Sequence, residues 1–121
     1  LWGAFYLKVE GLPSMYFGGD SGYDDHFKEV PMLLGKPDVC FLGVGAYKPE
    51  WFMSPNHSSP EDAVQAFHDL KGSIMIPMHY GTFDLSDEPP GEPFRILNKM
   101  KENGLINGEL KMPGIGESVT V

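Results

Sequence analysis

The sequence predicts an α/β fold, because two strands of buried character alternate with segments of helical periodicity. Residues 39–44 (VCFLGV) and 73–78 (SIMIPM) are nearly continuous apolar runs, as expected of strands that are covered on both faces. A sharply bounded helical pattern lies between them, and a second one follows over 92–103. This alternation of strand and helix is typical of layered α/β domains.

Two shorter strands are expected near the N-terminus. Residues 4–9 are rich in aromatic and β-branched side chains, and residues 15–17 (MYF) form a similar run. The segment 11–14 (GLPS) between them carries turn residues. The pair is therefore predicted to form a hairpin.

A short helix is predicted after the glycine-rich loop 18–22. Tyr23, Phe27 and Val30 recur at the spacing of one helical face. The first buried strand comes next, and residues 47–58, with two prolines, are predicted to form a long irregular loop.

The helix that follows this loop has the clearest boundaries. Ser59 is a suitable N-cap, Pro60 suits the first helical position, and Glu61 and Asp62 complement the helix dipole. Gly72 is expected to terminate the helix in the left-handed conformation. Its apolar residues are Ala63, Val64, Ala66, Phe67 and Leu70.

The C-terminal third is predicted to contain one more helix and weak edge strands. After an acidic loop over 82–91, residues 92–103 read as a helix that stops at Gly104. The side chains expected to face inward are Phe94, Leu97 and Met100. Residues 109–121 are expected to give one or two edge strands, broken by proline and glycine.

Composition excludes several classes of function. The 121-residue chain has a formal net charge of −8, which disfavours binding to nucleic-acid phosphates and to anionic lipid heads. Its single cysteine, Cys40, fits a reducing compartment, and we expect a cytoplasmic protein. The longest nearly apolar run, 39–47, has nine residues, against about 20 for a membrane-spanning helix, so no transmembrane segment is predicted.

Three segments carry residues suited to chemistry, and each of them comes after a predicted strand. Asp20 in GGDSGY is a carboxylate that could hold one metal ion or bridge two, and His79 in PMHYGT is a candidate zinc ligand. Catalytic groups of α/β proteins gather beyond the carboxyl ends of strands. Each residue also has a structural interpretation, an Asx turn for Asp20 and a satisfied loop histidine for His79.

The third segment is an aromatic loop that ends in His57. Residues 51–53 (WFM) could wall an apolar pocket, and His57 could orient a substrate or stabilise developing negative charge. The alternative is a loop that simply packs on the domain. Of the other histidines, His26 is expected beside the site and His68 on the helix surface.

Taken together, these segments resemble one branch of the metallo-β-lactamase fold. The sequences GGDSGYDDHFKEV, PDVCFLGVGAYKPEWFMSPNHSSPEDAVQAF and IPMHYGTFDLSDEPPGEP occur in that order. They are similar to the C-terminal half of the N-acylphosphatidylethanolamine-hydrolysing phospholipase D and its bacterial relatives. The ascorbate-6-phosphate lactonases are more distant relatives.

The resemblance implies a fold, a cofactor and residue roles. The fold would be half of an αββα sandwich, a mixed sheet with helices packed on one face. Asp20 would bridge two metal ions, His79 would bind the second ion, and His57 would contact the substrate. The ions are usually zinc, with manganese and iron as alternatives that the same ligands accept. The implied reaction is hydrolysis of an ester, phosphodiester or lactone in a small-molecule or lipid-like substrate.

The departure from the family is the absence of its HxHxDH metal motif. The chain begins with Leu, and we expect residues 1–121 to form a single partial domain that is inactive alone. Its uncovered sheet face should then be an apolar patch that meets the missing N-terminal half or a second copy. Two alternatives stay open: an active homo-oligomer that shares a metal site between chains, and a non-catalytic interaction module.

Overall fold

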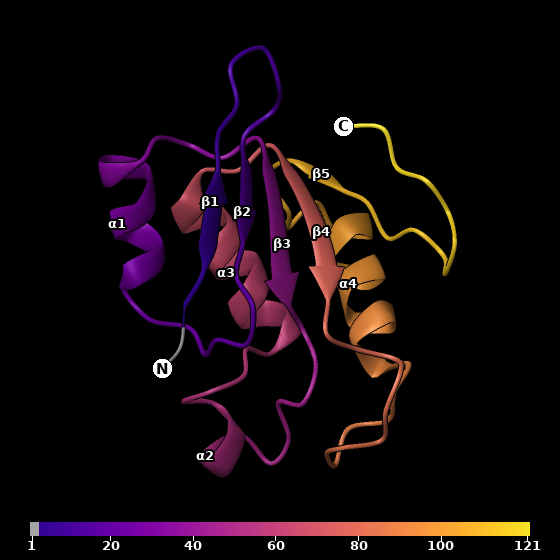
Figure 1. The fold of residues 1–121 in the computed structure, drawn as a ribbon. Helices are drawn as coiled ribbons and strands as arrows, with labels where there is room; N and C mark the ends of the chain where they lie inside the picture. The colour runs from indigo at the N-terminus through magenta and orange to yellow at the C-terminus, as the bar shows by residue number, and fades with distance from the viewer. Residues whose placement is uncertain (1–2) are drawn as a thin grey trace.

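A computed structural model describes residues 3–121, and in this range five strands form one sheet (Figure 1). The strands are β1 (Phe5–Leu7), β2 (Met15–Phe17), β3 (Val39–Gly43), β4 (Ile74–Met78) and β5 (Glu109–Leu110), and they lie side by side in that order. β1 pairs antiparallel with β2, and the remaining neighbours are parallel. The α/β prediction and the N-terminal hairpin are confirmed, as is the mixed sheet.

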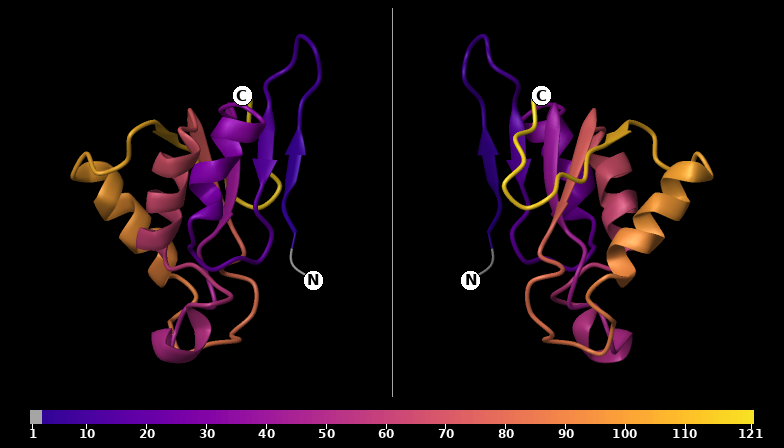
Figure 2. Two further views of the ribbon diagram at one scale, coloured as in Figure 1. Left: turned by 90° about the vertical axis from the view of Figure 1, so that its left-hand side faces the viewer. Right: turned by 90° about the vertical axis from the view of Figure 1, so that its right-hand side faces the viewer.

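The helices are α1 (His26–Leu33), α2 (Glu50–Met53), α3 (Pro60–Leu70) and α4 (Glu92–Glu102). Figures 1 and 2 show α1, α3 and α4 together on one face of the sheet. The one-turn helix α2 lies in the segment predicted to be irregular, so that prediction is wrong in this detail. None of the helices in the described range is long and apolar enough to cross a membrane.

The core lies between the sheet and α3, whose local signals specify it well. Ser59 and Asp62 form a capping box, and Pro60 occupies the first turn. All the predicted apolar residues of this helix are buried. The prediction for its end is wrong, because Lys71 and not Gly72 takes the left-handed conformation, with φ of 57°. Gly72 is instead needed for space: a Cβ there would lie 2.5 Å from the Cys40 sulfur.

Helix α4 packs inward at two of the three predicted residues, and the prediction for the third is wrong. Leu97 is buried and Met100 packs against the core, but Phe94 is 45% exposed. The buried residue of the first turn is Pro93, which lies four positions before Leu97 and so shares its face. In the described residues after α4, only the two-residue β5 forms at the edge of the sheet.

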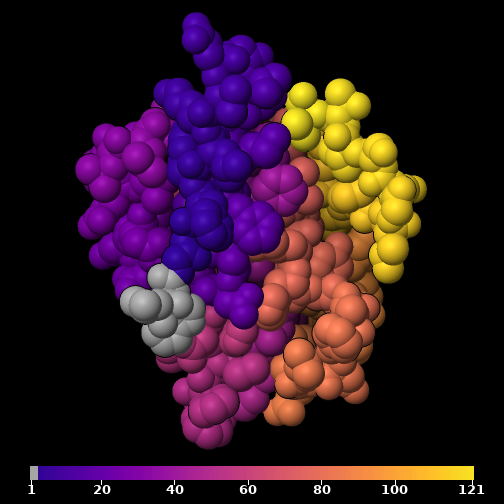
Figure 3. Space-filling view, in the orientation of Figure 1, coloured from indigo at the N-terminus to yellow at the C-terminus, as the bar shows by residue number. Residues whose placement is uncertain are grey.

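The face of the sheet away from the helices carries exposed apolar side chains. Tyr16 contacts Phe27 of α1 on the helical side, so its neighbour Phe17 points to the other side. Phe5 lies opposite Phe17 in the hairpin register. Phe5, Leu7 and Phe17 are 69%, 52% and 42% exposed. Figure 3 looks onto this open face, which is the apolar patch expected from the sequence.

Candidate metal centre

Three loops meet at the carboxyl edge of the sheet and bring Asp20, His57 and His79 together. Asp20 follows β2, His79 directly follows β4, and His57 lies between α2 and α3. Each residue offers one ligand atom, and these atoms all lie within 4.8 Å of one another. The structure therefore joins the three residues that the sequence proposed separately.

The closest approach in this cluster is between Asp20 and His79. The His79 Nε2 atom lies 3.2 Å from the Asp20 Oδ1 atom. The His57 and His79 rings are nearly parallel, with an interplanar angle of 25° and centroids 5.3 Å apart. The side chains of Asp20 and His79 are 55% and 32% exposed, so the cluster is open to solvent.

Two glycines let the loops approach closely enough to form the cluster. A Cβ at Gly22 would lie 2.3 Å from the Ser54 carbonyl oxygen, and one at Gly45 would lie 2.1 Å from the His79 carbonyl oxygen. Ser58 Oγ donates a hydrogen bond to the Ser21 carbonyl at 2.8 Å. This bond joins the loop after β2 to the segment between α2 and α3. The sequence reasoning missed the roles of Gly22 and Gly45, because their partners are distant along the chain.

The backbone of His79 is itself unusual. Its φ is 63°, in the left-handed region that L residues rarely adopt. Such conformations cluster at functional sites, where surrounding contacts hold them. Here Gly45 lies against the His79 carbonyl and Gly43 lies against its Cβ. The turn after β4 is therefore fixed by the end of β3 beside it.

The imidazole of His57 is biased toward its neutral form. Burial lowers its pKa, and the nearby His79 lowers it further, whereas Asp20 and Glu88 act in the opposite direction with less effect. A neutral imidazole can accept a hydrogen bond or bind a metal ion. His57 is thus available for either role at neutral pH.

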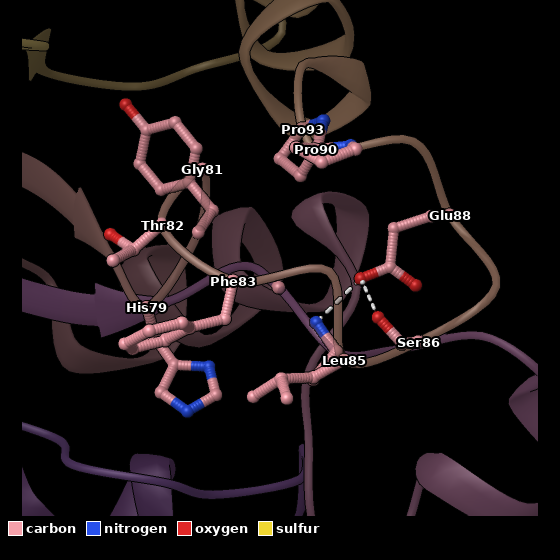
Figure 4. A pocket seen from close by; sticks show the side chains of 12 residues that line it. His79, Gly81, Thr82, Phe83, Leu85, Ser86, Glu88, Pro90 and Pro93 are labelled. Atoms are coloured by element: carbon pink, nitrogen blue, oxygen red, sulfur yellow. Dashed lines mark hydrogen bonds between the residues drawn. The ribbon is translucent and has the colours of Figure 1, made fainter.

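A cavity of about 310 Å³ opens beside His79 (Figure 4). Its apolar lining includes Ala46, Phe83, Leu85, Pro90 and Pro93. The segment 51–53, predicted to wall such a pocket, does not line this cavity. Trp51 and Phe52 are instead 83% and 63% exposed on α2.

The other two histidines lie outside the cluster. His26 is exposed, and its Nε2 lies 3.5 Å from Ser21 Oγ, next to the loop that carries Asp20. His68 is half-buried and accepts a hydrogen bond from the Asn107 N–H at 3.1 Å. The prediction of His68 as a surface residue did not include this hydrogen bond, which depends on the return of the chain after α4.

Comparison with known proteins matches residues 1–80 to the family model described as the β-lactamase superfamily domain. This range includes the loops of Asp20 and His57 and ends just after His79. The chain belongs to the metallo-β-lactamase superfamily. Its members among the matched proteins include metal-dependent hydrolases, and the resemblance drawn from the sequence motifs is confirmed.

One relative is the mitochondrial N-acyl-phosphatidylethanolamine-hydrolyzing phospholipase D of Saccharomyces cerevisiae. It is 32% identical over 120 residues, which cover 98% of this chain and 26% of the yeast protein. A UPF0173 metal-dependent hydrolase of Myxococcus xanthus is 28% identical over 102 residues, 84% of this chain and 33% of that protein. This chain spans about a quarter of the length of the first curated relatives it matches.

Solved structures support the same fold. The metallo hydrolase Igni18 of Ignicoccus hospitalis matches with a TM-score of 0.67 and 23% identity, over 96% of this chain and 44% of that one. The fold thus extends beyond the range that the family model matches.

The donor set of the cluster fits a divalent metal ion, which the superfamily implies. Imidazole nitrogen and carboxylate oxygen are ligands for zinc, manganese and iron. Two atoms that each lie about 2.1 Å from one ion are separated by at most about 4.2 Å. The separation of 3.2 Å between His79 Nε2 and Asp20 Oδ1 meets this condition.

Proposed function

We propose that this chain supplies Asp20 and His79 to the metal site of a hydrolase that cleaves esters, phosphodiesters or lactones. The observation that carries the proposal is the approach of these two side chains at the carboxyl edge of the sheet, within a superfamily of metal-dependent hydrolases. Zinc is the proposed metal. A divalent ion held there lowers the pKa of water and offsets the negative charge that develops in hydrolysis.

His57 is proposed to act on the substrate. Its position beside His79 and its lowered pKa make it a neutral imidazole at the edge of the site. A neutral imidazole can donate a hydrogen bond to an oxygen on which charge develops. The neighbouring cavity, with its apolar lining, suits a hydrocarbon part of the substrate.

A lipid-like phosphodiester is the substrate class that we favour. The name of the yeast relative describes hydrolysis of N-acyl-phosphatidylethanolamine, a lipid of this class. The exposed Phe83 and Leu85 at the cavity would contact an acyl chain.

The single buried cysteine supports a cytoplasmic location.

The proposal includes a second structural unit that completes the site. Catalytic zinc sites have three protein ligands and a water, and Asp20 and His79 supply two. The open apolar face of the sheet supports an occupant that also presents a sheet, as in the αββα sandwich of the family. The N-terminal half of such a protein is the proposed occupant, and residues 1–121 are then one part of the complete domain.

Native mass spectrometry with zinc titration tests the metal site on the purified chain. We expect zinc to bind and to raise the melting temperature, because a ligand that binds only the folded state stabilises it. Asp20→Ala should abolish both effects, whereas Asp84→Ala, which removes an exposed carboxylate outside the cluster, should preserve them. Absence of zinc binding by the wild-type chain would overturn the proposal that Asp20 and His79 hold metal without the second structural unit.

A further inference from the structure

Glu88 is the one charged side chain among the buried residues in the range 3–121, with an exposed fraction of 6%. It lies in the acidic loop after β4, nine residues after His79 in the sequence but outside the metal cluster. A buried carboxylate is costly unless hydrogen bonds satisfy it. The hydrogen-bond donors to the Glu88 carboxylate therefore indicate its structural role.

The Glu88 carboxylate binds the backbone of the loop after β3. Its Oε1 accepts hydrogen bonds from the Ala46 N–H at 2.6 Å and from Ser86 Oγ at 2.7 Å (Figure 4). Its Oε2 accepts from the Lys48 N–H at 2.9 Å. One side chain thus joins the loop after β4 to the loop after β3.

The segment held by Glu88 lies between the two histidines of the site. On one side, Gly45 lies against the His79 carbonyl. On the other side, the chain enters α2, and the Met53 carbonyl accepts a hydrogen bond from the His57 N–H at 2.9 Å. A shift of residues 46–48 would therefore reach both His79 and His57.

Glu92 reinforces the same segment from the start of α4. Its Oε2 accepts from Tyr47 Oη at 2.7 Å and from Lys48 Nζ at 2.8 Å. These contacts are made through side chains, and the Lys48 ammonium is partly exposed. Of these two carboxylates, only Glu88 accepts hydrogen bonds from backbone N–H groups of residues 46–48. The Asp87 N–H adds a backbone hydrogen bond to the Lys48 carbonyl at 3.3 Å.

We propose that Glu88 is a positioning residue, which holds residues 46–48 against the loop after β4 and so fixes His57 relative to His79. The expected effect on zinc affinity rests on the proposed function. The placement of the His57 ring relative to the His79 ring does not depend on that function.

The ionised state of Glu88 agrees with this role. Burial acts to raise its pKa, but the hydrogen bonds from Ser86 and from backbone N–H groups, including those of Lys48 and Ala46, outweigh burial and leave the pKa lowered. The carboxylate can then accept from every donor that faces it.

Glu88→Gln is the test variant, and Asp62→Asn is its matched control. Glutamine keeps the size of the side chain, but its NH₂ group replaces one carboxylate oxygen. This NH₂ group then faces a hydrogen-bond donor and cannot accept from it. Asp62 also accepts from a backbone N–H and from a hydroxyl, both of Ser59, but it lies in the cap of α3. The control therefore removes a comparable set of contacts away from residues 46–48.

Amide hydrogen exchange, the ring–ring NOE between His57 and His79, and zinc affinity are measured on all three proteins. Glu88→Gln should accelerate exchange at Ala46 and Lys48 and weaken the NOE. It should also lower zinc affinity by about tenfold, because Gly45 at the start of this segment lies against the carbonyl of the proposed metal ligand His79. Asp62→Asn should accelerate exchange in the first turn of α3 and leave the NOE unchanged, with zinc affinity within about twofold of the wild type. A merely structural role for Glu88 predicts equal effects of the two variants on the NOE and on zinc affinity.

The inference is overturned if Glu88→Gln leaves the His57–His79 NOE unchanged, or if Asp62→Asn weakens it equally. If the wild-type chain binds no zinc, metal binding by residues 1–121 alone fails, and the NOE alone decides the role of Glu88. If Glu88→Gln does not fold, Ser86→Ala replaces it, because it removes one hydrogen-bond donor to the Glu88 carboxylate. The same changes in hydrogen exchange, NOE and zinc affinity are then expected, with smaller size.

Discussion

His57 differs from Asp20 and His79 in the way its surroundings control its charge. Burial and the neighbouring His79 ring lower its pKa, so the imidazole stays uncharged at neutral pH. Asp20 and His79 approach each other to 3.2 Å and are the pair suited to share an ion. The three residues thus form one cluster but differ in what removal of each should do.

Truncation of His57 separates a substrate role from a ligand role. For His57→Ala we expect zinc affinity to fall by less than about tenfold, because the Asp20–His79 pair remains. In the protein that completes the site, hydrolysis should fall by about 10²–10⁴-fold, the usual contribution of a positioned acid–base group. Zinc titration and initial-rate measurements check both. A loss of zinc affinity as large as that of Asp20→Ala would instead make His57 a metal ligand.

Glu88 should make stability depend on pH in the acidic range. Its folded-state pKa lies below its ordinary value of 4.5, so the ionised form favours folding. This contribution is complete above about pH 4.5 and is lost as the pH falls through the lowered folded-state pKa. Melting temperatures measured down the acidic range should therefore show the wild type converging on Glu88→Gln. A constant difference between the two proteins at all pH values would contradict this prediction.

At the scale of single elements, helix α3 and the strands β3 and β4 make the central packing unit. The capping box defines where α3 begins, and its buried face covers β3. At the other end of the helix, Gly72 lies so close to Cys40 and Phe67 that no side chain fits without movement. The helix end is thus set by packing space as well as by backbone conformation.

Gly72→Ala tests that packing limit. The added methyl would lie 2.5 Å from the Cys40 sulfur and 2.6 Å from the Phe67 ring. We expect the free energy of unfolding to fall by about 1–3 kcal/mol, as for other overpacked cores. Gly3→Ala, where nothing lies within 4 Å of the new Cβ, should change it by less than about 0.5 kcal/mol. Chemical denaturation of both variants makes the comparison, and equal effects would refute the packing argument.

Elements specified by local signals were predictable, and those that depend on distant contacts were not. The N-cap and apolar face of α3 follow from its own residues, and the positions of Asp20 and His79 follow from strand ends. The exposure of Phe94 and the hydrogen bond of His68 depend on how α4 and the chain after it pack. The roles of Glu88, Gly22 and Gly45 could not be predicted for the same reason, since each acts on a loop far away in the sequence.

At the scale of the whole molecule, the two faces of the sheet differ sharply. The three long helices cover one face (Figure 2). Phe5, Leu7 and Phe17 remain exposed on the other. The metal cluster lies at one end of this sheet, at the carboxyl ends of the parallel strands β2, β3 and β4. An occupant of the open face that extends to this edge would therefore also reach the cluster.

This asymmetry predicts that the isolated chain self-associates through the open face when no complementing half is present. The double variant Phe5→Lys/Phe17→Lys should shift the chain toward monomer, because charged side chains would then face each other across the contact. Trp51→Lys changes an even more exposed aromatic residue away from that face and should leave the association unchanged. Sedimentation equilibrium measures the association constants. Self-association that survives the double variant but not Trp51→Lys would move the contact to α2 and leave the open face without a role in it.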